Sequence, residues 1–154
     1  MSKFPSKKVL TAWIDYIHEN LILIEKTKKT DEDEMRFINE AVEILQKSDD
    51  IDLKCGAKVA ELYEKIGLFN QNKANDHEQA LLFHRKELDM NQKLHQGGDH
   101  EKTANSLNNL GNVCDNLNDY SKALDYYQQA LAMRERLLKT ENGMLSNVPS
   151  MFNK

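Results

Sequence analysis

The stretch from Asp99 to Leu138 decides the fold, because it holds two helical patterns on either side of a short polar break. It reads DHEKTANSLNNLGNVCDNLNDYSKALDYYQQALAMRERLL. In its first half the apolar positions recur every three or four residues, at Leu107, Leu110, Cys114 and Leu117. In its second half the same spacing joins Ala123, Tyr127, Ala130, Met133 and Leu137. Such spacing is typical of amphipathic helices, so the stretch predicts a helical hairpin with its turn at Asn118 and Asp119.

Small residues on the two patterns indicate that the two helices approach closely. Gly111 lies in the middle of the first pattern, where glycine costs about 1 kcal/mol relative to alanine. A glycine in that position usually has a packing reason. We therefore predict that Gly111 and Ala123 lie at the closest contact between the two helices.

The spacing of these residues resembles that of the tetratricopeptide repeat. The pattern runs Leu107-x2-Leu110-Gly111-x2-Cys114, then Ala123-x3-Tyr127 and Ala130, with Leu107 in the usually aromatic slot. The string from Gly98 to Gly111 is similar to the long repeats of kinesin light chains. Those repeats usually have proline where this chain has Glu101, and often a proline that ends the second helix, where this chain continues through Glu135. The resemblance implies an all-α superhelix, or solenoid, of antiparallel helix pairs.

Earlier copies of the hairpin are expected, because one hairpin cannot bury its own apolar face. A shift of 44 residues places Tyr63, Ile66 and Gly67 on the first helix of the pattern. A shift of 43 matches the second helix, where His84 and Glu87 replace an aromatic residue and an alanine. A fainter third copy follows at a further shift of 46. The sequence therefore predicts three antiparallel helix pairs, at about residues 6–48, 52–96 and 99–140, in one domain of residues 1–143.

The first predicted helix runs from Ser6 to about Lys28 and carries an apolar stripe that we expect to face the core. The stripe consists of Leu10, Trp13, Ile14, Ile17, Leu21 and Ile24. The acidic run at 31–34 opens the second helix, and the helix dipole explains it better than a binding site does. The last predicted helix begins near Tyr120 and ends before Gly143.

Composition argues against several classes of protein. The net charge of −4 provides no basic surface for nucleic acid. No run approaches the roughly 18 apolar residues of a membrane span, and no secretory signal pattern follows the N-terminal lysines. The two cysteines, Cys55 and Cys114, fall on helical patterns, which favours a reducing, cytoplasmic location over a disulfide framework.

The sequence shows no motif for catalysis, and we expect neither enzyme activity nor a metal or cofactor. Gly97-Gly98 reads as a helix stop and not as a phosphate-binding loop. Asp15 and His18 share a helix face, but a metal site needs further ligands. A helical enzyme or metal protein remains a remote alternative.

The informative surface is the polar face of the fifth helix, which we expect to be exposed. At 3.6 residues per turn, five asparagines lie within an arc of about 100° opposite the leucines. They are Asn105, Asn108, Asn109, Asn112 and Asn116. Asparagine is a poor helix former, but its amide both donates and accepts, so it can pair with a peptide backbone. The family resemblance implies that first helices line the concave face, and that asparagines there hold cargo peptides in kinesin light chains. The alternative is a merely solvated face.

The same face in the earlier hairpins completes a predicted groove. In the middle hairpin it comprises Glu61, Glu64, Lys65, Leu68 and Asn72. In the first hairpin it comprises Asp15, His18, Glu19, Ile22 and Lys26. This groove leans acidic and lacks the basic clamp by which some relatives grip a C-terminal carboxylate, so a chaperone-tail adaptor is disfavoured. The sequence instead predicts a scaffold or adaptor module that binds a protein or peptide segment.

A self-associating or architectural fragment of a larger repeat protein is the main alternative, with a homodimer formed through the tail or the terminal repeat. The tail of residues 144–154 is unusually apolar for a disordered end. We predict that it docks on the last two helices or on a second copy. The alternative is that it belongs to a longer array.

Overall fold

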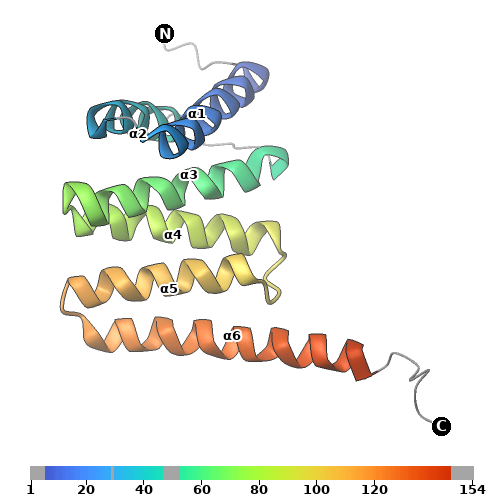
Figure 1. The fold of residues 1–154 in the computed structure, drawn as a ribbon. Helices are drawn as coiled ribbons and strands as arrows, with labels where there is room; N and C mark the ends of the chain where they lie inside the picture. Colours follow the sequence, from blue (N-terminus) through green and yellow to red (C-terminus); the bar gives the residue numbers. More distant parts are fainter. Residues whose placement is uncertain (1–5, 29, 47–52, 147–154) are drawn as a thin grey trace.

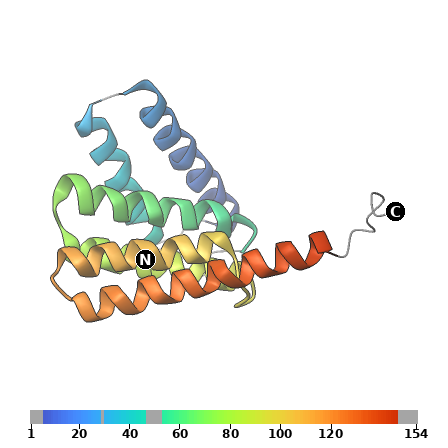
Figure 2. The same cartoon turned by 60° about the horizontal axis from the view of Figure 1, so that its bottom comes forward.

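The computed structural model describes residues 6–28, 30–46 and 53–146. These residues form six α-helices and no strand (Figure 1). The helices are α1 (Lys7–Thr27), α2 (Asp31–Gln46), α3 (Gly56–Phe69), α4 (His77–Leu94), α5 (Glu101–Asn116) and α6 (Tyr120–Ser146). They pack as three antiparallel pairs stacked in chain order, which confirms the predicted all-α solenoid. Figure 2 shows that the first pair lies at an angle to the other four helices.

The third pair closes around Gly111, as the sequence predicts. A β-carbon at Gly111 would lie 2.5 Å from the ring of Tyr127, so only glycine lets the tyrosine lie flat on α5. Ala123 is also buried on α6. The second pair repeats this contact, because a β-carbon at Gly67 would lie 2.6 Å from the imidazole of His84. The shifts of 44 and 43 residues therefore relate residues with the same role in packing.

The turns of these two pairs differ by one residue, and the structure shows where that residue goes. After α3 the chain makes a π-helical turn, η2 (Asn70–Ala74), which accommodates the extra residue. Both turns then place an asparagine in the left-handed conformation, with φ of 54° at Asn75 and 61° at Asn118. Asparagine tolerates this conformation better than most residues, and it ends the first helix of each pair.

In the first pair the predicted stripe is correct except at one residue. Ile14, Ile17, Leu21 and Ile24 are buried against the core, but Trp13 is 57% exposed. The prediction for Trp13 was wrong because the residue lies at the edge of the stripe. The equivalent edge residues of α3 and α5, Val59 and Thr103, are buried. A preceding helix pair covers this edge of α3 and of α5, whereas no helix precedes α1 among the described residues.

The last helix does not end before Gly143, as the sequence analysis expected, but continues to Ser146. Glycine inside a helix lowers its stability by about 1 kcal/mol without obliging it to stop. The remaining tail, residues 147–154, and the predicted boundary between the first two hairpins, at about residues 48–52, lie outside the described residues. Among the helices of the described ranges, none is both long and apolar enough to cross a membrane.

Candidate functional site

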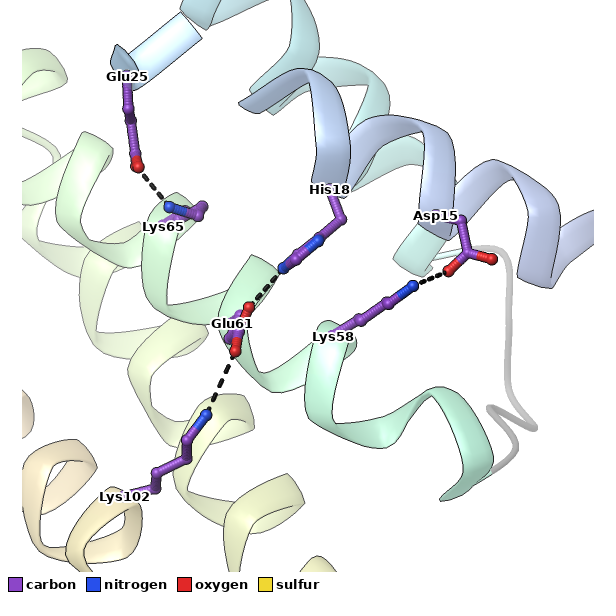
Figure 3. A network of polar contacts seen from close by, with 7 residues as sticks. All are labelled: Asp15, His18, Glu25, Lys58, Glu61, Lys65 and Lys102. Atoms are coloured by element: carbon purple, nitrogen blue, oxygen red, sulfur yellow. Dashed lines mark hydrogen bonds and ion pairs between the residues drawn. The ribbon is translucent and has the colours of Figure 1, made fainter. Parts of the chain in front are cut away.

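The first helices of the three pairs lie side by side and exchange polar contacts (Figure 3). Lys58 of α3 donates to Asp15 of α1 over 2.6 Å. Glu61 of α3 pairs with His18 of α1 and accepts from Lys102 of α5 over 3.3 Å. These contacts join α1, α3 and α5 into one surface, which we call the groove face. It is built from the helix faces that the sequence analysis selected in the first two pairs.

Charges on the groove face are arranged as pairs. Burial raises the pKa of the Glu61 carboxyl, but the hydrogen bonds from His18 and Lys102 outweigh it and lower the pKa overall. The hydrogen bond to Asp15 raises the pKa of Lys58. Both side chains are therefore charged at neutral pH. Lys65 likewise pairs with Glu25 at the other end of α1.

Glu64 differs from its neighbours on the groove face. Its side chain is half-buried and makes no hydrogen bond or ion pair to any residue in the described ranges. Burial raises the pKa of its carboxyl, and the nearby Glu87 carboxyl raises it further. The nearby Lys65, His84 and Lys102 act in the opposite direction, but burial and Glu87 outweigh them, and the pKa of Glu64 is raised overall. A cationic group brought to this position would be attracted to the carboxylate.

The asparagines of α5 are more constrained than the sequence analysis expected. Asn105 and Asn116 are exposed, but Asn108, Asn109 and Asn112 are half-buried. The expectation of a wholly exposed face was wrong, because helices α4 and α6 flank α5 closely enough for their side chains to reach it. Asn105, Asn109 and Asn112 each form a hydrogen bond with a side chain of α4 or α6.

The contacts that hold the amides leave specific atoms for a ligand. Asn112 accepts a hydrogen bond from the hydroxyl of Tyr127 over 2.7 Å, so its amide NH2 remains as a donor. Asn109 donates to Glu87 over 3.5 Å, so its carbonyl oxygen remains as an acceptor. Asn105 accepts from Arg134 over 2.6 Å. The groove face of α5 thus presents an oriented donor and an oriented acceptor one helical turn apart.

The other predicted groove residues of α1, α3 and η2 differ in burial. Leu68 and Ile22 are half-buried apolar residues, whereas Glu19, Lys26 and Asn72 are exposed. Lys58, Lys102 and Glu25 were missed by the sequence analysis. The available signal was position, because Lys58 and Lys102 each lie one helical turn before a predicted groove residue, Glu61 and Asn105.

A buried polar cluster lies behind the groove face, which we define as His84, Glu87, Asn91 and Ser106. The Nδ1 atom of His84 lies 2.8 Å from a carboxylate oxygen of Glu87, and the other oxygen accepts from Ser106 over 2.7 Å. Asn91 donates to the Ser106 hydroxyl over 2.9 Å. All four side chains are buried, and Asn109 connects the cluster to the groove face. The sequence signal was the replacement of an aromatic residue and an alanine by His84 and Glu87.

No group of three or more histidine, cysteine or acidic side chains in the described parts of the chain is arranged to hold a metal ion. Cys55 and Cys114 are both buried and form no disulfide. Burial raises the pKa of the Cys114 thiol, which disfavours the reactive thiolate.

Comparison with known proteins identifies the repeat. A family model described as tetratricopeptide repeat matches residues 58–136, from the first turn of α3 well into α6. No curated protein sequence and no solved structure matches the chain. The matched region covers both copies of the glycine–ring contact and the polar contacts between α3 and α5. The chain belongs to the tetratricopeptide repeat family.

Proposed function

We propose that the groove face binds an extended segment of another protein, so that the chain acts as a non-catalytic adaptor or scaffold. Tetratricopeptide repeats generally serve protein–protein interaction. The observation that carries the proposal for this chain is the pair of oriented amides at Asn109 and Asn112. A free donor and a free acceptor on one helix face suit the alternating NH and CO groups of an extended backbone.

The charges around these amides favour a segment with a basic residue. Glu64 is half-buried without an ionic partner in the described ranges, whereas the neighbouring Glu61 is neutralised by Lys102. A lysine or arginine in the bound segment would satisfy Glu64. Half-buried Leu68 adds a short apolar contact on the same helix. We therefore expect backbone recognition by the amides and side-chain selection by Glu64.

The resemblance to kinesin light chains supports the same function, since asparagines on the first helices of those repeats hold cargo peptides. We propose that this chain carries repeats of that subclass. Cys55 and Cys114 are buried and are not joined in a disulfide, which agrees with a reducing compartment, and we propose a cytoplasmic location.

The proposal can be tested with a displayed library of random linear peptides. Peptides selected by the protein should be enriched in one basic position. Replacing Asn109 and Asn112 by alanine removes the two oriented amides. Glu87 keeps its contacts with His84 and Ser106, so the fold should persist, and circular dichroism verifies it. If each amide contributes about 1 kcal/mol, the double variant should bind selected peptides at least roughly tenfold more weakly.

The matched control is Asn39→Ala, which removes an exposed asparagine from α2, away from the groove face. It should leave peptide binding unchanged. Unaltered binding by the groove variant, or equal loss in the control, would show that peptides are held elsewhere.

A further inference from the structure

Two helix faces at opposite ends of the described stack carry exposed apolar side chains. On α6, Leu124, Leu131 and Leu138 are 57%, 59% and 57% exposed. On α1, Val9, Tyr16 and Leu23 are 44%, 57% and 48% exposed. Members of each set are seven residues apart, which places them on one side of their helix. A row of exposed apolar side chains marks an interaction surface more strongly than scattered ones do.

The internal repeat shows what the α6 row would contact. With the shift of 43 residues, Leu124 corresponds to Leu81 of α4, and Leu131 corresponds to Leu88. Both α4 leucines are half-buried, and Leu81 lines a shallow hollow with Cys114 and Leu117 of α5. The α6 row is therefore of the kind that packs against the first helix of a following pair.

The α1 row has the complementary role. Tyr16 corresponds to Leu62 of α3 and to Ser106 of α5, and all residues at this position are buried except Tyr16. The position of Leu23 is taken by Phe69 and Val113, which are also buried. In α5, Ser106 contacts α4, the second helix of the preceding pair. The α1 row is therefore of the kind that receives such a helix.

We propose that α6 of one copy of this chain packs antiparallel on α1 of a second copy, so that copies associate head to tail. The contacts between α4 and α5 define the register of such a junction. Transferred to α6 and α1, that register sets Leu124, Leu131 and Leu138 alongside Leu23, Tyr16 and Val9, in that order. Both rows have the same seven-residue spacing, so all three contacts form together.

A polar residue beside the two rows supports a second copy as the occupant. In the α4–α5 junction Asn91 donates to Ser106. The equivalent residues at the proposed junction are Arg134 of α6 and Tyr16 of α1. An arginine guanidinium over a tyrosine ring is a favourable cation–π contact, worth about 0.5–1 kcal/mol at exposed sites. Within its own chain the Arg134 guanidinium donates to Glu101 and Asn105, so the proposed contact with Tyr16 uses the face of the guanidinium and not these N–H groups.

Because the two faces are different, the contact is heterologous, and copies can continue to add until a ring closes. The mass of the wild-type protein in solution should exceed the monomer mass of 17.8 kDa and rise with concentration. Light scattering after size-exclusion chromatography measures it directly.

The decisive experiment blocks one face at a time. Leu131→Glu places a charge in the α6 row, and Tyr16→Glu places one in the α1 row. Each variant alone should remain at the monomer mass. An equimolar mixture should form a dimer and nothing larger, because each variant keeps the face that the other has lost. Leu124→Glu gives an independent block of the α6 row.

Two control variants place a glutamate on the same helices but outside the α6 and α1 rows. Thr140→Glu on α6 and Thr11→Glu on α1 change exposed residues outside the rows and should associate like the wild type. Circular dichroism verifies that each variant is folded. The proposal is overturned if the wild type stays at 17.8 kDa at all concentrations. It is also overturned if Tyr16→Glu still self-associates, as a dimer through α6 alone would, or if the mixture of variants stays monomeric.

Discussion

Lys58 and Lys102 occupy equivalent positions in α3 and α5, and each donates to a carboxylate on the first helix of the preceding pair. Lys58 reaches Asp15 over 2.6 Å, and Lys102 reaches Glu61 over 3.3 Å. Asp15 and Glu61 are themselves equivalent in the repeat. The same cation–carboxylate contact therefore recurs along the groove face and holds consecutive first helices in one register.

The contribution of Glu61 should depend on pH. Its folded-state pKa is lowered from an ordinary value of 4.5, so its stabilising contribution is present above that value and is lost as the pH falls through the folded-state pKa. Glu61→Gln should therefore lower the free energy of unfolding at pH 7 by no more than about 1 kcal/mol, since the carboxylate is partly exposed. Urea unfolding of both proteins between pH 7 and pH 3 should show the difference shrinking below the ordinary value. A difference that grows towards low pH would contradict this assignment.

Glycine substitutions should have opposite effects at two positions on the third pair. Gly111→Leu forces side-chain atoms into the ring of Tyr127 and should cost about 1–3 kcal/mol. Gly143→Ala, where no atom of the described residues lies within 4 Å of an added β-carbon, should stabilise the helix by up to about 1 kcal/mol. Thermal melting should show a lower melting temperature for Gly111→Leu and a higher one for Gly143→Ala. An unchanged melting temperature in Gly111→Leu would mean that α5 and α6 are paired differently.

The groove asparagines should divide into two classes. From the sequence alone, replacing Asn108, Asn109 and Asn112 by alanine is expected to keep or raise stability, because alanine is the better helix former on an exposed face. The structure preserves that expectation for Asn108 and reverses it for Asn112, whose loss leaves the Tyr127 hydroxyl without its acceptor. We expect Asn112→Ala to cost about 1 kcal/mol.

A double-mutant cycle with Tyr127→Phe tests the attribution of that cost. If the hydrogen bond is responsible, Asn112→Ala should cost little in the Tyr127→Phe background. Additive costs of the two substitutions would show that the stability change has another origin.

The buried polar cluster should be sensitive to loss of its central carboxylate. Glu87→Ala leaves His84 and Ser106 buried without their shared partner and should cost about 3–5 kcal/mol in urea unfolding. Adding His84→Tyr reproduces the Tyr127 and Ala130 arrangement of the third pair and should recover part of this loss. Glu78→Ala on exposed α4 surface is the matched control and should change stability by less than about 0.5 kcal/mol. A small effect of Glu87→Ala alone would show that the cluster is not tightly coupled.

The helix pairs were predictable because burial leaves a periodic pattern in the sequence, and Gly67 and Gly111 align the copies. The groove face followed from the same periodicity, since it lies opposite the apolar stripe. Whether its residues bind a peptide stays a prediction.

Periodicity alone could not assign the partners of each face. It placed Trp13 in the core because a helix stripe carries no information about whether another helix covers its edge. It missed Lys58 and Lys102 because flexible charged side chains pair by reach across helices. His84 and Glu87 weakened the match of the second copy, although they are a matched buried pair.

The buried polar cluster also bears on how the pairs find their correct order during folding. Hairpins with similar apolar faces can dock on the wrong neighbour, which is a characteristic failure of repeat proteins. Here Glu87 pairs with His84 of its own helix and accepts from Ser106 and Asn109 of α5, while His84 packs on Gly67 of α3. An arrangement with α4 at the end of the stack, or beside a helix without that serine, would leave the carboxylate without its hydrogen bonds from α5. The cluster is thus satisfied only in the correct order of helices, which the leucines and alanines alone do not specify. Misordered stacks are therefore less stable than the correct one.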